Sequence, residues 1–155
     1  MAAEVEVDDF RQVYIPWPIF GNAKLGASVG DIDPKYWATF HKGVDLLVPE
    51  GTPVYAVMDG VVQITGYDIR FGNRVWILCD QLDYGRVRFG YCHLVGSIVE
   101  FGAQVKVGQL LGYSGATGKR LDETNVPPHL HFQSEVYPSR EILRPVFDGD
   151  PLPER

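Results

Sequence analysis

The chain has 155 residues, of which 45% are hydrophobic and 22% are charged, and its formal net charge is −6 at pH 7. That length is enough for one domain with a buried core, and the composition is that of an ordinary globular protein. The acidic balance argues against the basic surface that nucleic-acid binding requires, so we expect no nucleic-acid partner.

Residues 1–10, MAAEVEVDDF, lack both the basic start and the long apolar stretch of a secretory signal. No apolar run approaches the ~18 residues that a membrane helix needs, so we expect no membrane span. Three origins stay open: a cytoplasmic protein, a protein exported by another route, and a domain cut from a longer precursor.

The first 39 residues are rich in aromatic and turn residues, which predicts an edge strand followed by a long wrapping loop. Residues 51–57, GTPVYAV, and 60–67, GVVQITGY, are short β-branched runs on either side of an MDG turn signal, and they predict a hairpin. A second hairpin is predicted from residues 73–80, NRVWILCD, and 85–94, GRVRFGYCHL.

Glycines interrupt short apolar runs over residues 96–115, which predicts several short strands with sharp turns between them. Residues 129–137, HLHFQSEVY, form the last predicted strand. Residues 138–147, PSREILRPVF, predict about one helical turn that Pro145 ends, and 148–155 are a polar tail. We therefore predict a single all-β domain, a compact and mostly antiparallel sheet or sandwich.

The two cysteines form no CxxC pair and so indicate no cysteine-rich zinc or redox motif. In a tight second hairpin Cys79 would lie opposite a residue near Arg88, and Cys92 opposite a residue near Val75. The thiols would then be several residues apart along the ladder, too far for a disulfide. We predict two free, buried thiols.

The four histidines are the most informative residues. On a strand, His129, His131 and Gln133 point to one face, while Leu130, Phe132 and Ser134 point to the other. A histidine pair of this kind is either part of a polar sheet surface or half of a metal site. His93 ends another predicted strand and, taken alone, is by default a surface or hydrogen-bonded group.

His41 stands four residues before Asp45, and the two would lie roughly 13 Å apart on a straight strand. If both bind one ion, the chain must bend between them, and Gly43 permits such a bend. Asp45 could also be a simple turn carboxylate. A catalytic zinc typically has three protein ligands, often imidazole and carboxylate, and His41, Asp45 and His131 could supply that set.

Several segments together resemble the lysostaphin-type zinc endopeptidases, which cleave peptide cross-links in bacterial peptidoglycan. They are FHKGVDLLVPEGTPVYAVMDGVV, FGNRVWI, YCHL, GAQVKVGQLLGYSGATG and PHLHFQSEV, in this order over roughly residues 40–137. The resemblance implies a compact, mostly antiparallel β fold with a narrow groove, one zinc ion per chain, and action in the cell envelope or outside the cell. We expect a monomer.

The resemblance implies that His41, Asp45 and His131 bind the zinc ion. It also implies that His129 and His93 stand unligated beside the zinc-bound water, and we expect His129 to be the base and His93 its partner.

Two further residues are candidates for contact with the substrate or the reacting groups. Tyr36 could hydrogen-bond the developing oxyanion, although it could equally be a packing aromatic. Gln133 stands where the family usually has a glutamate, so a neutral amide replaces a carboxylate near the metal.

Two other functions are compatible with the same segments. One is a non-catalytic zinc-binding or regulatory cell-wall protein on the same fold, and the other is a histidine phosphocarrier. The sequence also leaves the cleaved bond open, because glycine bridges and D-alanyl links to a diamino acid are both compatible with it.

Overall fold

A computed structural model describes residues 9–149, so residues 1–8 and most of the predicted polar tail lie outside the described part. The described chain contains strands, turns and loops but no helix, which confirms the all-β prediction. In this part of the chain there is accordingly no helix long and apolar enough to cross a membrane. The strands are β1 (Gln12–Ile15), β2 (Lys24–Leu25), β3 (Val44–Leu47), β4 (Pro53–Tyr55), β5 (Gly60–Asp68), β6 (Gly72–Gln81), β7 (Gly85–Ser97), β8 (Gln104–Val105), β9 (Leu110–Ser114), β10 (Leu130–Tyr137) and β11 (Ile142–Phe147).

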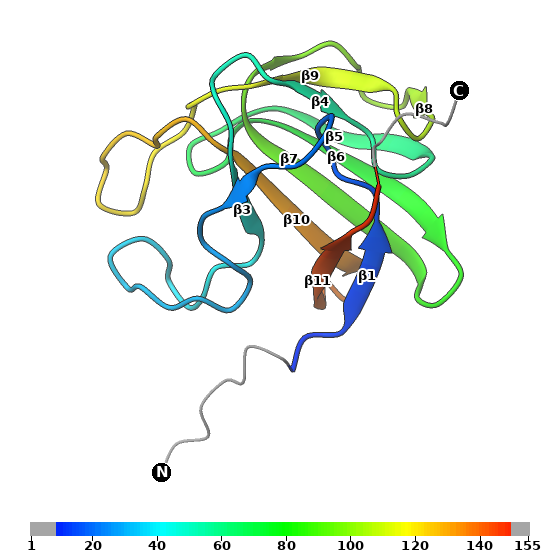
Figure 1. The fold of residues 1–155 in the computed structure, drawn as a ribbon, viewed down its shortest axis with the longest axis horizontal. Helices are drawn as coiled ribbons and strands as arrows, with labels where there is room; N and C mark the ends of the chain where they lie inside the picture. Colours follow the sequence, from blue (N-terminus) through cyan, green and yellow to red (C-terminus); the bar gives the residue numbers. More distant parts are fainter. Residues whose placement is uncertain (1–8, 150–155) are drawn as a thin grey trace.

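The strands form one curled sheet whose main path runs β1-β11-β10-β7-β6-β5-β8. Among the described strands, the pairing of β1 with β11 is parallel and the other pairings are antiparallel. Figure 1 shows the long strands of this sheet side by side, with the loops that follow β2 and β9 extending from the same side of it. These two loops form the walls of the candidate site.

Strand β10 carries His131 and Gln133 and is paired along both of its edges. One of its edges pairs with β7 over residues 131–137. Its other edge is shared, because β3 pairs with residues 130–132 and β11 pairs with residues 134–135. The segment that carries two of the four histidines is therefore held on both sides.

Alternate residues of β10 divide between the core and the site, as the sequence pattern predicts. Leu130 and Phe132 are fully buried, and the Phe132 ring lies 5.7 Å from that of Phe89 and 5.3 Å from that of Tyr91. Burying each such side chain is worth about 1.5–3 kcal/mol. A one-residue slip would exchange these side chains for histidines, so packing of the core fixes the direction of His131.

The predicted second hairpin is confirmed as β6 and β7. Cys79 lies opposite Val87, one residue from the expected Arg88, and Val75 lies opposite Tyr91, the residue before Cys92. Both thiols are free and buried, as predicted.

The predicted hairpin at MDG is wrong. Strand β4 pairs with β9, whereas β5 pairs with β6 and β8, so the chain turns a corner between two different neighbours. The Asp59 carboxylate accepts a hydrogen bond from the backbone N–H of Val107, which ties this corner to the strand connection beside it. Gly60 does not serve a hairpin turn. It allows close packing, because a Cβ there would lie 2.4 Å from the carbonyl oxygen of Leu78.

The predicted helical turn before Pro145 is also wrong, because residues 142–147 form strand β11. The edge of β10 beyond the end of β3 offers free backbone groups, and Ile142 and Leu143 pair with it. Leu143 is then fully buried in the core. Tertiary pairing therefore overrides a weak local preference.

Candidate metal centre and groove

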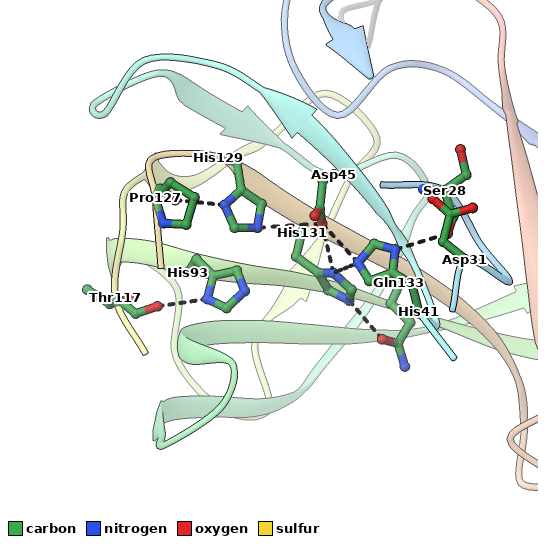
Figure 2. A network of polar contacts seen from close by, with 10 residues as sticks. All are labelled: Ser28, Asp31, His41, Asp45, His93, Thr117, Pro127, His129, His131 and Gln133. Carbon is green, nitrogen blue, oxygen red and sulfur yellow. Dashed lines mark hydrogen bonds and ion pairs between the residues drawn. The ribbon is translucent and has the colours of Figure 1, made fainter. Parts of the chain in front are cut away.

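Three side-chain atoms from two neighbouring strands and the segment before one of them converge on one point (Figure 2). Nε2 of His41 lies 3.1 Å from Oδ1 of Asp45, and Nδ1 of His131 lies 3.1 Å from the same oxygen. The two nitrogens are 3.2 Å apart. Ligands bound tetrahedrally at about 2.0–2.1 Å from a zinc ion are about 3.3 Å apart, so this triangle has the size of one face of a zinc site.

The backbone places His41 and fixes its imidazole. Residues 26–30 run beside residues 41–45 and exchange backbone hydrogen bonds with them, including Gly30 N–H to the carbonyl of His41 at 2.8 Å. The carbonyl oxygen of Ser28 lies 3.1 Å from Nδ1 of His41. A carbonyl can only accept, so Nδ1 carries the proton and Nε2 is left as a lone pair toward Asp45.

Gly43 has a different role from the one that the sequence suggested. It is not in the left-handed region of φ, but a Cβ there would lie 2.4 Å from the carbonyl oxygen of Phe132 and 2.8 Å from the ring of His131. The missing side chain therefore lets the chain before β3 lie against β10. The His41 and Asp45 side chains meet because of that close approach.

His131 is oriented by Gln133, two residues further along the same face of β10. Oε1 of Gln133 lies 2.9 Å from Nε2 of His131, and Nε2 of Gln133 donates to Oε2 of Glu135 at 2.6 Å. An ionised Glu135 carboxylate accepts hydrogen bonds but cannot donate them, so the Gln133 amide turns its nitrogen toward Glu135 and its oxygen toward His131. His131 then carries its proton on Nε2 and turns the lone pair of Nδ1 toward Asp45.

The chain of contacts ends on a buried cation. Nε of Arg88 donates to Oε1 of Glu135 at 2.9 Å, and the Arg88 guanidinium lies 4.4 Å over the ring of Trp76. Gln133, Glu135 and Arg88 are all buried. The carboxylate that the sequence lacks at 133 is therefore present two residues later, one amide further from the metal group.

His93 and His129 stand beside the triangle, and each donates to a backbone carbonyl. Nδ1 of His93 lies 2.7 Å from the oxygen of Thr117, and Nδ1 of His129 lies 2.7 Å from the oxygen of Pro127. Their rings are 4.8 Å apart, and Nε2 of His129 is 3.5 Å from Oδ1 of Asp45. Each therefore presents an unprotonated Nε2 to the site.

Burial keeps both of these histidines neutral. It lowers the pKa of His93 to about 3, and the neighbouring His131 and His129 add to the effect. Burial also lowers the pKa of His129, although the Asp45 carboxylate opposes the shift. Neutral imidazoles at neutral pH can accept a proton, which is the property that a general base needs.

The triangle itself needs a positive charge. Burial raises the pKa of Asp45, but a proton on the facing nitrogen of His131 or His41 hydrogen-bonds the carboxylate, outweighs burial and holds the pKa well below its usual range. With outward-facing protons on His41 and His131, the three atoms that face each other are all acceptors. A proton or a metal ion between them relieves the repulsion, and the two compete for the same place.

The three candidate ligands lie at the floor of a groove of about 430 Å³. One wall is the loop between β2 and β3, with Tyr36 and Trp37, and the Trp37 ring is 4.6 Å from that of His41. The other wall is the loop between β9 and β10, which contributes Lys119, Arg120 and residues up to His129. The groove expected from the sequence is therefore present, with the polar cluster at its base.

All the residues singled out in the sequence line this groove: Tyr36, His41, Asp45, His93, His129, His131 and Gln133. The carbonyl acceptors of Ser28, Thr117 and Pro127 could not be found in the sequence, because every residue has a carbonyl. Glu135 could have been found, since it continues the alternation of the histidine face, whereas Arg88 comes opposite it only through the pairing of β10 with β7.

Comparison with known proteins finds one family. The sequence model described as Peptidase family M23 matches residues 39–142. Peptidoglycan DD-endopeptidase ShyC from Vibrio cholerae is 37% identical over 93 residues, which are 60% of this chain and 19% of the relative. Glycyl-glycine endopeptidase ALE-1 from Staphylococcus capitis is 38% identical over 94 residues, which are 60% of this chain and 24% of the relative. The chain thus spans about a fifth to a quarter of the length of these curated relatives.

A solved structure agrees with this result. The catalytic domain of the antimicrobial peptidase lysostaphin from Staphylococcus simulans is 32% identical and superimposes with a TM-score of 0.66. The match covers 79% of this chain and 88% of that domain.

The neutral state of His93 predicts how the metal-free protein responds to acid. Below about pH 6.5 an unfolded chain protonates this imidazole, whereas the folded protein does so only near its lowered pKa, so the free energy of unfolding should fall as pH drops from 6.5 toward 3. His93→Asn should make this fall shallower, by up to about 1.4 kcal/mol per pH unit. Urea unfolding of both proteins in chelator at several pH values measures the two slopes. Equal slopes would show that His93 is not held neutral by the fold.

Proposed function

Because the chain belongs to peptidase family M23, we propose that it is a zinc-dependent endopeptidase that hydrolyses peptide cross-links of bacterial peptidoglycan. The observation that carries the proposal is the triangle of His41 Nε2, Asp45 Oδ1 and His131 Nδ1, with edges of 3.1–3.2 Å. Two relatives whose names state a peptidoglycan or glycyl-glycine endopeptidase activity support the substrate class.

Zinc fits this donor set, because two imidazoles and one carboxylate leave a fourth position open on the groove side. One ion per chain would be held by His41, Asp45 and His131. When bound, it supplies a Lewis acid for the scissile carbonyl and lowers the pKa of a water molecule to around 7. The remaining chemistry belongs to the side chains around it.

His129 is the proposed base. Its Nε2 points into the site 3.5 Å from Asp45 Oδ1, its Nδ1 proton is held by the Pro127 carbonyl, and its pKa is lowered by burial. It can therefore take the proton of the attacking water and pass it to the departing amine. His93, with its ring 4.8 Å away, is placed to orient the water or to donate to the developing oxyanion once protonated.

Two other residues have supporting roles in this proposal. Tyr36 lines the groove and is the candidate for a hydrogen bond to the oxyanion. Gln133 is buried, and both ends of its amide are used within the protein, which favours a positioning role through His131 over contact with the substrate.

The proposed substrate sets the place of action, which is the bacterial cell envelope or the space outside the cell. A monomer suffices, because one chain supplies all the proposed ligands and both unligated histidines.

Each of His41→Ala, Asp45→Ala and His131→Ala should abolish stoichiometric zinc binding and hydrolysis of purified peptidoglycan together. Each change removes one of three ligands and leaves the other two with an incomplete site. Metal analysis, muropeptide release and circular dichroism on the same preparations test this. Gln104→Ala, at the exposed position of β8, is a control that should bind one zinc ion per chain. A folded ligand variant that retains full zinc would remove that residue from the metal site.

His129→Ala should keep its zinc and lose turnover. Loss of general acid–base help lowers kcat by roughly 10²- to 10⁴-fold, whereas the three proposed ligands are untouched. Steady-state hydrolysis of a defined cross-linked peptide, with zinc content measured in parallel, gives both quantities. His93→Ala should also retain zinc but lose less. Hydrolysis by zinc-loaded His129→Ala at the wild-type rate would leave His129 a structural residue.

Gln133→Met should weaken zinc binding by about 10- to 100-fold, because the change removes the hydrogen bond that fixes the ring of His131 and the bond to Glu135 that holds the amide in place. Competition with a chromophoric chelator measures the affinity. Nitrogen NMR shifts of the metal-free protein should also show His131 losing its single tautomer. If both readouts match the wild type, Gln133 does not orient His131.

A further inference from the structure

The groove carries charge of the opposite sign to the whole protein. The chain has a formal net charge of −6, yet the groove is lined by four cationic side chains and one carboxylate. That carboxylate, Asp45, belongs to the proposed metal site. The cations are Lys42, Arg70, Lys119 and Arg120.

Arg70 is used to hold the groove wall in place. Its Nη1 donates to the carbonyl oxygens of Lys119 and Arg120, at 3.3 and 2.7 Å, and pairs with the Glu123 carboxylate at 3.1 Å. The turn is closed further by the N–H of Arg120, which donates to the carbonyl of Thr124 at 3.0 Å. The backbone that carries Lys119 and Arg120 is therefore fixed before any ligand arrives.

Neither of these two side chains forms an ion pair within the described protein. The guanidinium carbon of Arg120 lies 4.3 Å from the centre of the Tyr36 ring on the opposite wall, and Arg120 forms no ion pair among residues 9–149. The Lys119 ammonium donates to the neutral side-chain oxygen of Asn125. Asp122 on the same turn accepts hydrogen bonds from the N–H and hydroxyl of Thr124, and it interacts with Arg120 only through space, without an ion pair.

A guanidinium over an aromatic ring is held in place by the ring while its fork of N–H donors stays free to bind a carboxylate. This cation–π contact bridges the two walls of the groove whose floor holds the proposed metal site. A peptide lying along the groove with its scissile bond at that site would pass these cations. An uncharged peptide would desolvate them without giving a partner in return, which costs binding energy.

We propose that Arg120, with Lys119 beside it, binds a free carboxylate of the substrate peptide close to the scissile bond. The substrate is then a cross-link between stem peptides that carry free carboxylates, and not an uncharged oligoglycine bridge. This inference rests on the proposed function and makes its substrate class specific. The choice is not set by overall similarity, because the relatives named for the two bond types are 37% and 38% identical to this chain.

The test compares three substrates: a cross-linked peptide with a free carboxylate beside the scissile bond, the same peptide with that group as a carboxamide, and pentaglycine. The zinc-loaded wild-type chain should cleave the carboxylate form with a kcat/KM about 10- to 100-fold higher than the amide, as expected for a charge-assisted hydrogen bond. High salt should reduce this preference. Pentaglycine should be the poorest substrate.

Arg120→Gln should remove most of the preference by raising KM for the carboxylate peptide, with the amide peptide and zinc content little changed. Arg120→Lys keeps the charge but loses the fork, so it should retain part of the preference. Lys106→Gln, a change of an exposed cation outside the groove, should retain all of it. An Arg120→Gln enzyme that keeps the wild-type preference overturns the proposal, and so does an equal kcat loss on both peptides, which would indicate an effect through Tyr36.

Direct binding separates this inference from the proposed function. NMR titration of the metal-free wild type with the two peptides should show tighter binding of the carboxylate form, with shifts at Arg120 that Arg120→Gln abolishes. If no substrate is cleaved but this difference is present, the proposed catalysis fails and the carboxylate site stands. If cleavage occurs with no difference in binding or rate between the two peptides, the catalysis stands and the carboxylate site is refuted.

Discussion

The structure depends on one constraint, which is that each of the four buried imidazoles gives one N–H to a fixed acceptor. His41, His93 and His129 donate to backbone carbonyls, and His131 donates to the amide oxygen of Gln133. A carbonyl within a hydrogen-bonded backbone cannot exchange donor and acceptor roles, so the tautomer of each ring follows from the fold. The second nitrogen of every ring is then an acceptor. Two of these acceptors, with Asp45, form the metal triangle, and the other two stand beside it as proton acceptors.

The core enforces this arrangement from the other side of the sheet. Leu130 and Phe132 are fully buried, and each lies next to a histidine in sequence. The hydrophobic energy that keeps these side chains in the core also keeps the histidine face directed toward the groove. The same strand register therefore determines both the geometry of the site and the packing of the core. Gly43 completes the arrangement just before β3, where a Cβ would clash with the ring of His131. A displacement of the site would therefore require a displacement of the core.

The sequence predicts the strands and side-chain faces that follow from periodicity. It fails where pairing with a distant strand determines the local structure. The alternation in HLHFQSEV places His131 and Gln133 on one face, and the β-branched runs predict β6 and β7. The corner at MDG and the strand β11 depend on which edges of the sheet are left open, and local turn or helix signals carry no information about that. The backbone carbonyls that fix the tautomers cannot be predicted from the sequence at all, since the backbone of every residue has the same group. Glu135 and Arg88 lie between these cases, because the strand alternation predicts the face of Glu135, whereas the distant pairing of β10 with β7 brings Arg88 opposite it.

The same acceptors weigh against the two rival functions. A phosphocarrier must accommodate a phosphoryl dianion on an imidazole nitrogen, but Asp45 Oδ1 lies 3.1–3.5 Å from nitrogens of three of the four histidines and would repel it. A regulatory protein that binds no metal gains nothing from three acceptor atoms that face each other in a buried site, because that arrangement is destabilising without a cation. A catalytic metal site needs that arrangement, because the repulsion in the empty site increases the affinity for the ion. The bound dication would in turn favour the neutral form of His129 and His93, so the element that polarises the substrate also keeps the proposed base able to accept a proton.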